Sequence, residues 1–484
     1  MGSFFSFLVG IISPMILSRV FSKADYGTFK QVMYVYNTLL MVFTLGLPKA
    51  YSFFLPKYEK KYSKDIINKI TFLFIGMGLL FSVTLFTGAG AIAKILNNSD
   101  LSIALRYFAP TPLFLLPTIG LEGIYAAFRK TQYVTIYTIV TRFLTVALTV
   151  LPVFFMEGSF ISAIVGFDIA SFLMCLAALF LKSYPVRNEV HQRSELSIRQ
   201  ILQFSLPLMV ASLWGVVIGS ASQFFISRFY GNEVFADFSN GFMEIPIATM
   251  VISSVATVLL PRFSEMSKGE KMNDEVFALW KSAMEKSAMI IFPILVFSVA
   301  FSRLIMICLY GDAYSTSAVY FMIKNIGGLL YIIPFAPIIL AIGKTKMYAN
   351  IHMLVAFMIV LLELICVKTI YSPIAIAIIS EFSQILKVYL MIRVISHFTG
   401  RSIKELVPIK SLSKIFMACL TATLATLVFS KLISINKYLL ATICLSLFCL
   451  IYFRICKRIN LSYKGIISSL FPGSDKLPLL KYLP

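Results

Sequence analysis

Apolar stretches of about 20 residues recur from one end of this 484-residue chain to the other. Charged residues, glycine, proline or asparagine separate one stretch from the next. Since a helix of about 20 residues crosses the hydrocarbon core of a bilayer, each stretch predicts a transmembrane helix. The fourteen predicted helices lie at residues 3–21, 28–55, 70–96, 101–128, 134–156, 159–181, 202–228, 237–260, 287–310, 318–342, 349–370, 373–395, 415–433 and 438–453. The sequence therefore predicts an all-α integral membrane protein without room for a separate catalytic domain, and we expect no enzyme activity.

Two of these predicted helices, 28–55 and 101–128, are longer than a bilayer requires. Pro48 lies inside the first, and three prolines lie inside the second. Because proline has no N–H to donate and its ring clashes with the preceding turn, we expect both helices to kink at these residues.

The composition argues against a soluble protein and against a metal-dependent function. Hydrophobic residues make up 59% of the chain and charged residues 13%, whereas soluble domains average about 45 to 50% apolar residues. The seven cysteines contain no C-x-x-C pair and lie mostly in apolar stretches, and the three histidines show no H-E-x-x-H spacing. We therefore expect no cofactor, no metal site and no disulfide framework.

Basic residues gather on one side of the predicted membrane. Of the 43 lysines and arginines, most lie in the C-terminal tail and in one set of loops, which includes Lys57 and Lys182, while the opposite loops hold few. The positive-inside rule places the richer side in the cytoplasm, so we expect both termini to be cytoplasmic. The net charge of +21 then reflects membrane topology and contact with anionic membrane lipids, and we expect no nucleic-acid partner.

The chain also resembles itself at an offset of about 210 residues. The matching segments are LSRVFSKADYGTF (17–29) with ISRFYGNEVFADF (226–238), LPKY (55–58) with LPRF (260–263), and RKTQY (129–133) with GKTKM (343–347). Their order predicts two parallel halves of six helices each, a plan in which transporters hold the substrate between two bundles. We expect an N-terminal lobe at 1–200, a C-terminal lobe at 201–400, and helices 13 and 14 with a cytoplasmic tail at 401–484.

Charged side chains also occur inside the predicted helices. A lone lysine or arginine at mid-bilayer costs about 3 to more than 10 kcal/mol, so it is normally paired, extended to the interface or turned toward water. The basic residues within the spans or at their rims are Arg19, Lys30, Lys49, Arg106, Arg142, Arg228, Arg303, Lys324, Lys387 and Arg393. The acids there are Glu122, Asp168, Glu244, Glu363 and Glu381.

Four segments at loop junctions combine small and aromatic residues, and all but the third also carry basic residues. They are LSRVFSKADYGTFKQV (17–32), TLGLPKAYSFFLPKY (44–58), YGDAYSTSAVYF (310–321) and AIGKTKMY (341–348). Together with six plus six plus two helices, they resemble the polysaccharide (Wzx-type) flippases of the MATE-like, or MOP, transporter superfamily. The resemblance implies a V-shaped pair of bundles that open alternately and move an undecaprenyl-diphosphate-linked oligosaccharide from the cytoplasmic to the outer leaflet of the bacterial inner membrane. It also implies contacts with enzymes of polysaccharide assembly.

The diphosphate of such a substrate requires cationic contacts and the glycan a polar cavity, whereas the lipid tail can stay in the bilayer. Lys49 is the clearest candidate contact, because Pro48 removes a backbone hydrogen bond and Gly46 leaves space for the helix to bend toward a cavity. The alternative is that Lys49 only extends to the nearby cytoplasmic interface.

The other candidate cations also have structural alternatives. Arg19 and its repeat partner Arg228 could line the exit of a cleft or cap a helix C-terminus. Arg142 and Lys324 lie deeper, where the alternative to a cavity is a buried ion pair. Lys30 lies nearer the rim of the membrane.

The acids and a polar, aromatic segment complete the predicted site. A buried carboxylate that stays protonated until it is exposed can couple transport to H⁺ or Na⁺, and a structural salt bridge is the alternative for each acid. Asp168 and Glu381 occupy nearly equivalent positions in the two halves. Tyr34, Tyr36 and Asn37 could contact sugar rings or pack within a bundle.

Three rival functions stay open. A cation-coupled multidrug or metabolite antiporter would share this plan, although residues 3–21 contain no acid where drug-exporting relatives carry a cation-binding one. A membrane enzyme such as a glycan polymerase would usually carry reactive residues in a large external loop, and every predicted external loop is short. A channel would not require a transporter-type duplication.

Overall fold

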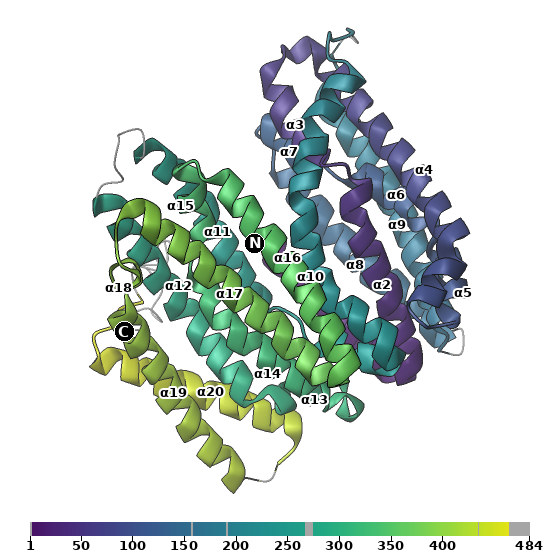
Figure 1. Cartoon of the computed structure of the whole chain (residues 1–484). Coiled ribbons are helices and arrows are strands. Elements are labelled where there is room, and N and C mark those ends of the chain that lie inside the picture. Colours follow the sequence, from purple (N-terminus) through teal and green to yellow (C-terminus); the bar gives the residue numbers. More distant parts are fainter. Residues whose placement is uncertain (1, 156–157, 190–191, 267–273, 434, 464–484) are drawn as a thin grey trace. The chain divides into compact units, whose positions relative to one another are not determined.

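A computed structural model describes residues 2–155, 158–189, 192–266, 274–433 and 435–463, with the side chains before residue 10 left aside. Every regular element in this described part is a helix (Figure 1). The α-helices are α1 (Gly2–Val20), α2 (Lys23–Phe43), α3 (Pro48–Phe54), α4 (Ser63–Ile95), α5 (Asp100–Phe108), α6 (Thr111–Leu115), α7 (Leu121–Ala127), α8 (Gln132–Phe155), α9 (Phe160–Ser183), α10 (Ile198–Gly241), α11 (Pro246–Met266), α12 (Asp274–Ala300), α13 (Ser302–Tyr310), α14 (Ser317–Gly328), α15 (Phe335–Ala341), α16 (Thr345–Thr369), α17 (Pro373–Thr399), α18 (Ile403–Leu406), α19 (Ile409–Leu432) and α20 (Lys437–Arg458). Short 3-10 turns are η1 (Leu55–Lys57), η2 (Lys60–Tyr62), η3 (Leu116–Thr118), η4 (Tyr184–Val186), η5 (Asp312–Tyr314) and η6 (Leu329–Ile332).

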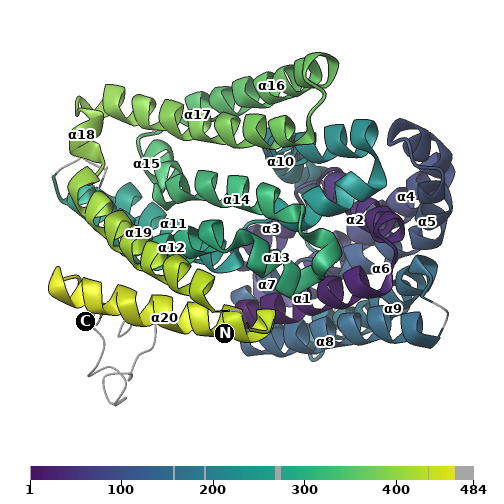
Figure 2. The ribbon, with the colours of Figure 1, turned by 90° about the horizontal axis from the view of Figure 1, so that it is seen from below.

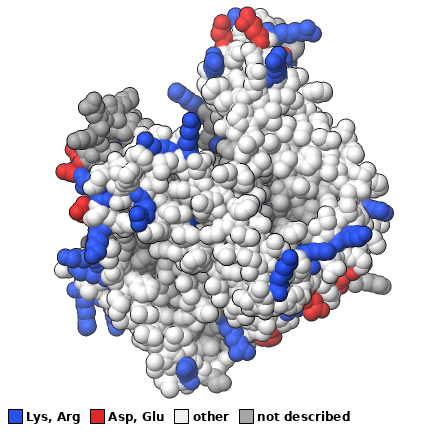
Figure 3. Space-filling model, in the orientation of Figure 1, with Lys and Arg blue, Asp and Glu red and all other residues white. Residues whose placement is uncertain are grey.

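The predicted all-α membrane protein is confirmed. Within the described residues, 11 helices are long and apolar enough to cross a membrane, or up to 12 if the bent pair Ile198–Val210 and Ser212–Gly241 is one span. The count of fourteen is not confirmed, because the first predicted helix qualifies only as a shorter apolar helix, Gly10–Val20, and the one at 101–128 is interrupted. Most of the face in Figure 3 is uncharged, as expected for a surface against lipid.

Prolines interrupt the predicted helix at 101–128, as expected. It forms α5, α6, η3 and α7 in place of one helix, with Gly120 in the left-handed region at φ 92°. Proline lacks the N–H that would continue a helical ladder, so each proline favours a new turn.

The break in the predicted helix at 28–55 has a different cause from the expected one. Helix α2 ends at Phe43, and Leu45 and Gly46 have positive φ values of 49° and 70°. Pro48 then begins α3 as its first residue, where a missing N–H costs nothing. The predicted kink is therefore present, but it lies before Pro48 and not at it.

Two predicted spans in the second half, 237–260 and 287–310, have wrong boundaries. The helix predicted at 202–228 ends close to Gly231, where two helices join across a kink to form α10, whereas α11 begins only at Pro246, so no helix starts at 237. The span predicted at 287–310 joins the apolar end of α12 to the separate α13. Hydropathy detects only the apolar part of α12, because its first turn carries Asp274 and Glu275.

Backbone contacts divide the chain into two compact units. Unit 1 comprises Met1–Ser239 and Glu363–Ile376, and unit 2 comprises Asn240–Leu362 and Ala377–Pro484. The predicted lobes at 1–200, 201–400 and 401–484 stay a prediction, and the predicted tail at 464–484 lies outside the described residues.

One stretch of secondary structure occurs twice. Helix α7 ends before Arg129, which has φ 55°, and α8 follows; helix α15 ends before Gly343, which has φ 72°, and α16 follows. A left-handed residue after the last helical turn is a common way to stop a helix. These positions are those of the matched RKTQY and GKTKM segments, so the local structure agrees with the proposed duplication there.

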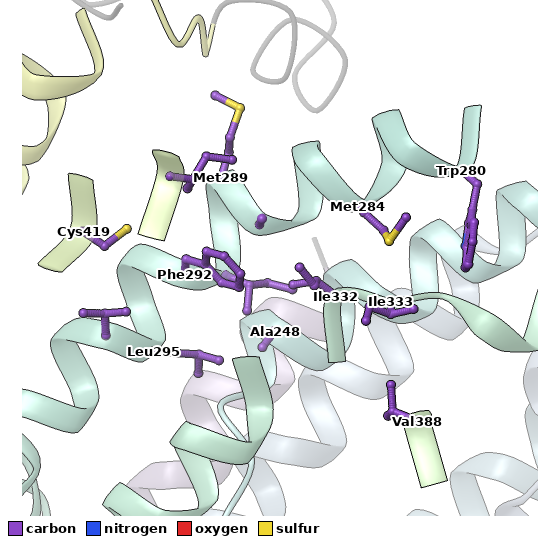
Figure 4. Close-up of a cluster of buried hydrophobic side chains, with 14 of the residues drawn as sticks. Ala248, Trp280, Met284, Met289, Phe292, Leu295, Ile332, Ile333, Val388 and Cys419 are labelled. Atoms are coloured by element: carbon purple, nitrogen blue, oxygen red, sulfur yellow. The ribbon is translucent and has the colours of Figure 1, made fainter. Parts of the chain in front are cut away.

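The core of unit 2 is apolar and continuous. Trp280 of α12 is fully buried and donates from Nε1 to the carbonyl of Pro334 over 3.1 Å. Met289, Phe292 and Leu295 extend the cluster along α12 (Figure 4). Helices α19 and α20 lie side by side and α19 packs on α12 (Figures 1 and 2), which buries Cys419 in the cluster. All seven cysteines, each in the described part, are free thiols.

Candidate functional site

In unit 1, Lys49 lies on the short helix α3, and two glycines let α3 pack closely against α7. A Cβ atom at Gly120 would lie 2.4 Å from the ring of Tyr51, and one at Gly123 would lie 2.8 Å from Oγ of Ser52. Any side chain at either position would push the two short helices apart. This contact fixes α3, with Lys49 exposed on its surface, beside α7.

A cavity of about 980 Å³ lies beside these two helices. It brings together five of the residues predicted from the sequence, namely Tyr36, Asn37, Lys49, Glu122 and Arg142. The volume is at the upper end of the range of small-molecule sites, about 300 to 1,000 Å³. Elements α2, α3, α7, α8 and α9 all contribute to the lining, so residues that are distant in the sequence form one site.

Lys49 and Arg142 are the cations of this cavity. Neither belongs to any of the ion pairs found among the described residues. Glu122 lines the same cavity, is exposed and forms none of those ion pairs either. Two cations and one acid therefore face a space large enough for a ligand, and the balance of charge favours an anion.

A second cavity in unit 1, of about 360 Å³, is lined by Lys30, Tyr34 and Asn37 of α2 and by Ser220 and Gln223 of α10. Asn37 lines both cavities. Hydroxyl and amide groups of this kind are suited to hydrogen bonds with a neutral polar ligand.

The two tyrosines and Lys30 also make contacts within the fold. The Tyr34 hydroxyl donates to the carbonyl of Ser220 over 3.3 Å. The Tyr36 ring is 5.7 Å from that of Phe81 and 5.4 Å from that of Phe108, between centroids. The Lys30 ammonium lies 5.3 Å from the centre of the Tyr26 ring, within the range of a cation–π contact. Each of the three residues thus combines packing with a place at a cavity.

Arg19 and Arg228 line neither cavity. Nη1 of Arg228 donates to the carbonyl of Lys94, 2.7 Å away in the last turn of α4. A cation at a helix C-terminus satisfies a free carbonyl and interacts favourably with the helix dipole. Arg228 therefore has the capping geometry, here toward a neighbouring helix, while Arg19 is exposed in the last turn of α1.

Lys324 of unit 2 has the ion-pair geometry. Its ammonium is 2.9 Å from Oε1 of Glu381 and 3.3 Å from Oε1 of Glu244, and it donates to the Tyr331 hydroxyl over 3.1 Å. Gly327 makes this possible, because a Cβ there would lie 1.9 Å from Oε2 of Glu381. Two of the five predicted acids thus surround one cation.

The two remaining acids lie apart from these clusters. Asp168 accepts a hydrogen bond from the Thr111 hydroxyl. Glu363 is fully buried and accepts a 2.5 Å hydrogen bond from Ser222, while its Oε2 has no hydrogen-bond partner in the described part of the chain. The nearly equivalent Asp168 and Glu381 therefore have different surroundings, one with a hydroxyl and the other with a lysine.

Sequence reasoning misplaced Lys182, which it assigned to a cytoplasmic loop. The side chain is only 1% exposed and belongs to the last turn of α9. Lys182 follows its apolar stretch directly, so hydropathy ends the predicted helix at 181 and treats the next residue as loop. Only the packing of other elements around the helix end shows that this residue is buried.

A family model described as polysaccharide biosynthesis protein matches residues 1–267. A search of curated proteins finds no match.

Solved structures share the fold. A lipid II flippase, MurJ, in an inward closed conformation aligns with a TM-score of 0.73 and 15% identity over 96% of this chain and 98% of its own. A multidrug resistance MATE family transporter of the MOP superfamily aligns with a TM-score of 0.62 and 12% identity over 82% of this chain and 96% of its own. A mutant of a Vibrio cholerae MATE transporter aligns with a TM-score of 0.57 and 13% identity over 82% of this chain and 95% of its own. At such identities the likeness is one of fold.

Proposed function

This chain belongs to the polysaccharide biosynthesis protein family, and we propose that it is a flippase for an undecaprenyl-diphosphate-linked oligosaccharide. It would move this lipid by alternating access from the cytoplasmic to the outer leaflet of the bacterial inner membrane. The basic loops support an orientation with both termini in the cytoplasm. The family and the fold support a membrane carrier, and the cavity in unit 1 supports this substrate class.

The observation that carries the proposal is the pair Lys49 and Arg142 on one cavity, neither in an ion pair with a described residue. A diphosphate carries several negative charges on closely spaced oxygens. Lysine offers a compact charge and arginine a planar fork that binds phosphate through two parallel hydrogen bonds. Lys49 and Arg142 are both exposed, so their charged groups are available to a ligand in the cavity.

The second cavity supports a place for the glycan. Asn37 belongs to both cavities, so a ligand with its diphosphate at Lys49 and Arg142 could extend past Asn37 toward Tyr34 and Gln223. These side chains offer donors and acceptors, and tyrosine also offers a flat face on which a sugar ring can stack. The lipid tail needs no site of its own, since the bilayer can hold it.

A cation-coupled antiporter is the second candidate, and Glu363 favours it. A fully buried carboxyl group with one oxygen lacking a described partner is a place where H⁺ or Na⁺ can bind. Such a site is also compatible with a flippase that uses an ion gradient. The remaining acids, Asp168, Glu122, Glu244 and Glu381, stay proposed coupling residues because they lie within or beside the predicted membrane spans, although each has surroundings different from those of Glu363.

The direct test is translocation of a defined undecaprenyl-diphosphate-linked sugar in liposomes that contain the purified protein. We expect Lys49→Ala to lower the translocation rate by about tenfold or more, because a hydrogen bond to a charged group contributes about 1.5 to 3 kcal/mol. The matched control is Lys368→Ala, which removes an exposed lysine from the last turn of α16. Unchanged translocation by Lys49→Ala at equal protein abundance would remove this residue from the site.

A further inference from the structure

Lys182 is a buried cation that the proposed transport path does not contact directly. Its ammonium donates to the Tyr51 hydroxyl over 3.0 Å and to the carbonyl of Ile119 over 2.8 Å. None of the ion pairs among the described residues includes it. A lysine held inside a helical membrane protein without a carboxylate is expensive, so its contacts call for a specific explanation.

The two acceptors of Lys182 belong to two neighbouring segments that both contribute residues to the cavity lining. Tyr51 is on α3, two residues after Lys49, and Ile119 is the extended residue between η3 and α7. Ile119 and its neighbour Gly120 both line the cavity of about 980 Å³. One ammonium group therefore bonds both to the short helix that carries the proposed phosphate contact and to the break that packs against this helix.

Further contacts fix the position of this ammonium group. It lies 4.8 Å from the centre of the Tyr51 ring and 5.2 Å from that of Phe74 on α4. The Tyr51 hydroxyl also shares a 2.8 Å hydrogen bond with the hydroxyl of Thr71 on α4. Aromatic faces stabilise a desolvated cation. The result is a buried network that joins α3, α4, α9 and the residue before α7.

The break before α7 explains why a donor is required here. Ile119 has φ −68° and ψ 144°, so the chain leaves the helical conformation inside the apolar part of the protein. A carbonyl at such a break must find a donor other than a regular helical N–H, because an unsatisfied polar group is costly away from water. Lys182 supplies that donor, and Gly120 then begins the turn into α7.

We propose that Lys182 is a positioning residue for the anion cavity: it holds α3 and the Ile119–Gly120 break at the separation that presents Lys49 to a phosphate group. This inference rests on the proposed function, since it assumes that the cavity binds a diphosphate lipid. Lys182 acts through Tyr51 and Ile119, and it does not itself contact the ligand.

The test measures binding of undecaprenyl diphosphate to the full-length protein in nanodiscs. Lys182→Met keeps an unbranched side chain only one atom shorter but removes the charge and its donors, and we expect about tenfold weaker binding from the loss of two hydrogen bonds. Lys368→Met, the same change at the exposed lysine of α16, should bind within about twofold of the unaltered protein, because it leaves both cavities intact.

A double-mutant cycle separates positioning from a merely structural role. If Lys182 acts through Lys49, the variant with both Lys49→Ala and Lys182→Met should bind no more than about threefold worse than Lys49→Ala alone. Independent effects that simply multiply would overturn the proposal. Unchanged binding by Lys182→Met would overturn it as well.

Two further measurements distinguish failure of the proposed function from failure of the positioning role of Lys182. If Lys182→Met does not fold, Tyr51→Phe replaces it in the same cycle; this change removes one hydroxyl, and we expect about threefold weaker binding that is again not additive with Lys49→Ala. If Lys49→Ala binds as tightly as the unaltered protein, the proposed function and this inference both fail. If Lys49→Ala weakens binding while Lys182→Met and Tyr51→Phe do not, only the positioning role is wrong.

Discussion

One cluster of residues in unit 1 and one in unit 2 hold their cations in opposite ways. In unit 1, Lys49 and Arg142 line a cavity and belong to none of the described ion pairs. In unit 2, Lys324 is only 8% exposed and lies between Glu381 and Glu244. A lysine thus forms a structural ion pair where acids surround it, as Lys324 does, and is available to a ligand where it lines a cavity, as Lys49 does. A charge inside a membrane protein points to a ligand site only when the fold does not already neutralise it.

The largest effect should come from breaking the paired cluster. We expect Lys324→Met to reduce the free energy of unfolding by about 3 to 5 kcal/mol, because it leaves a buried charge without its partner. Glu381 is 4% exposed and would carry most of this penalty, while Glu244 is exposed. Thermal unfolding of the purified protein measures the change.

The double variant Lys324→Met/Glu381→Gln is the control for this prediction. It removes both charges of the closest pair, so it should recover much of the lost stability. A Lys324→Met protein that unfolds normally but no longer binds undecaprenyl diphosphate would contradict the comparison, because Lys324 would then behave as a ligand contact.

Breaking the unpaired site should have a smaller effect, on binding alone. We expect Arg142→Ala to weaken retention of undecaprenyl diphosphate by about tenfold to a hundredfold, which corresponds to about 1.5 to 3 kcal/mol. The unfolding temperature should change little, since Arg142 forms no ion pair with a described residue. Arg106→Ala, an exposed arginine on α5, is the matched control. Normal retention by Arg142→Ala would argue for a structural role of this side chain.

The sequence predicted most of the fold where hydropathy and proline act locally. The interruption of 101–128 at its prolines and the all-helical class both follow from residues next to one another in the chain. The sequence-based predictions of helix boundaries were wrong where contacts with residues distant in the sequence determine where a helix begins or ends. Gly241 at the end of α10 lies against the carbonyl of Ser317, and Asp274 in the first turn of α12 forms an ion pair with Arg401. A window of hydropathy detects neither contact.

The sequence was sufficient to predict which residues are candidates for the site, but not which of them contact one another. Gly46 indicated that the chain could bend just before Lys49, and Lys49 lines a cavity, although Pro48 begins α3 and does not kink a helix. Nothing in the sequence indicated which cation would meet which acid, because Lys324 and Glu381 are 57 positions apart. Lys182 was missed for a related reason: a lysine at the end of an apolar stretch resembles any other membrane anchor until its neighbours are known.

The smallest effect is expected for Arg228, and measuring it distinguishes a cation that stabilises a helix end from one that binds a ligand. Arg228 donates to the last turn of α4, so we expect Arg228→Gln to reduce the free energy of unfolding by only about 0.3 to 1 kcal/mol. Binding of undecaprenyl diphosphate should be unchanged, because Arg228 lines neither cavity. Thermal unfolding and binding measured on one preparation give both values. If translocation falls sharply while stability is unaltered, Arg228 belongs to the substrate path, and the contrast between cavity cations and capping cations in unit 1 does not hold.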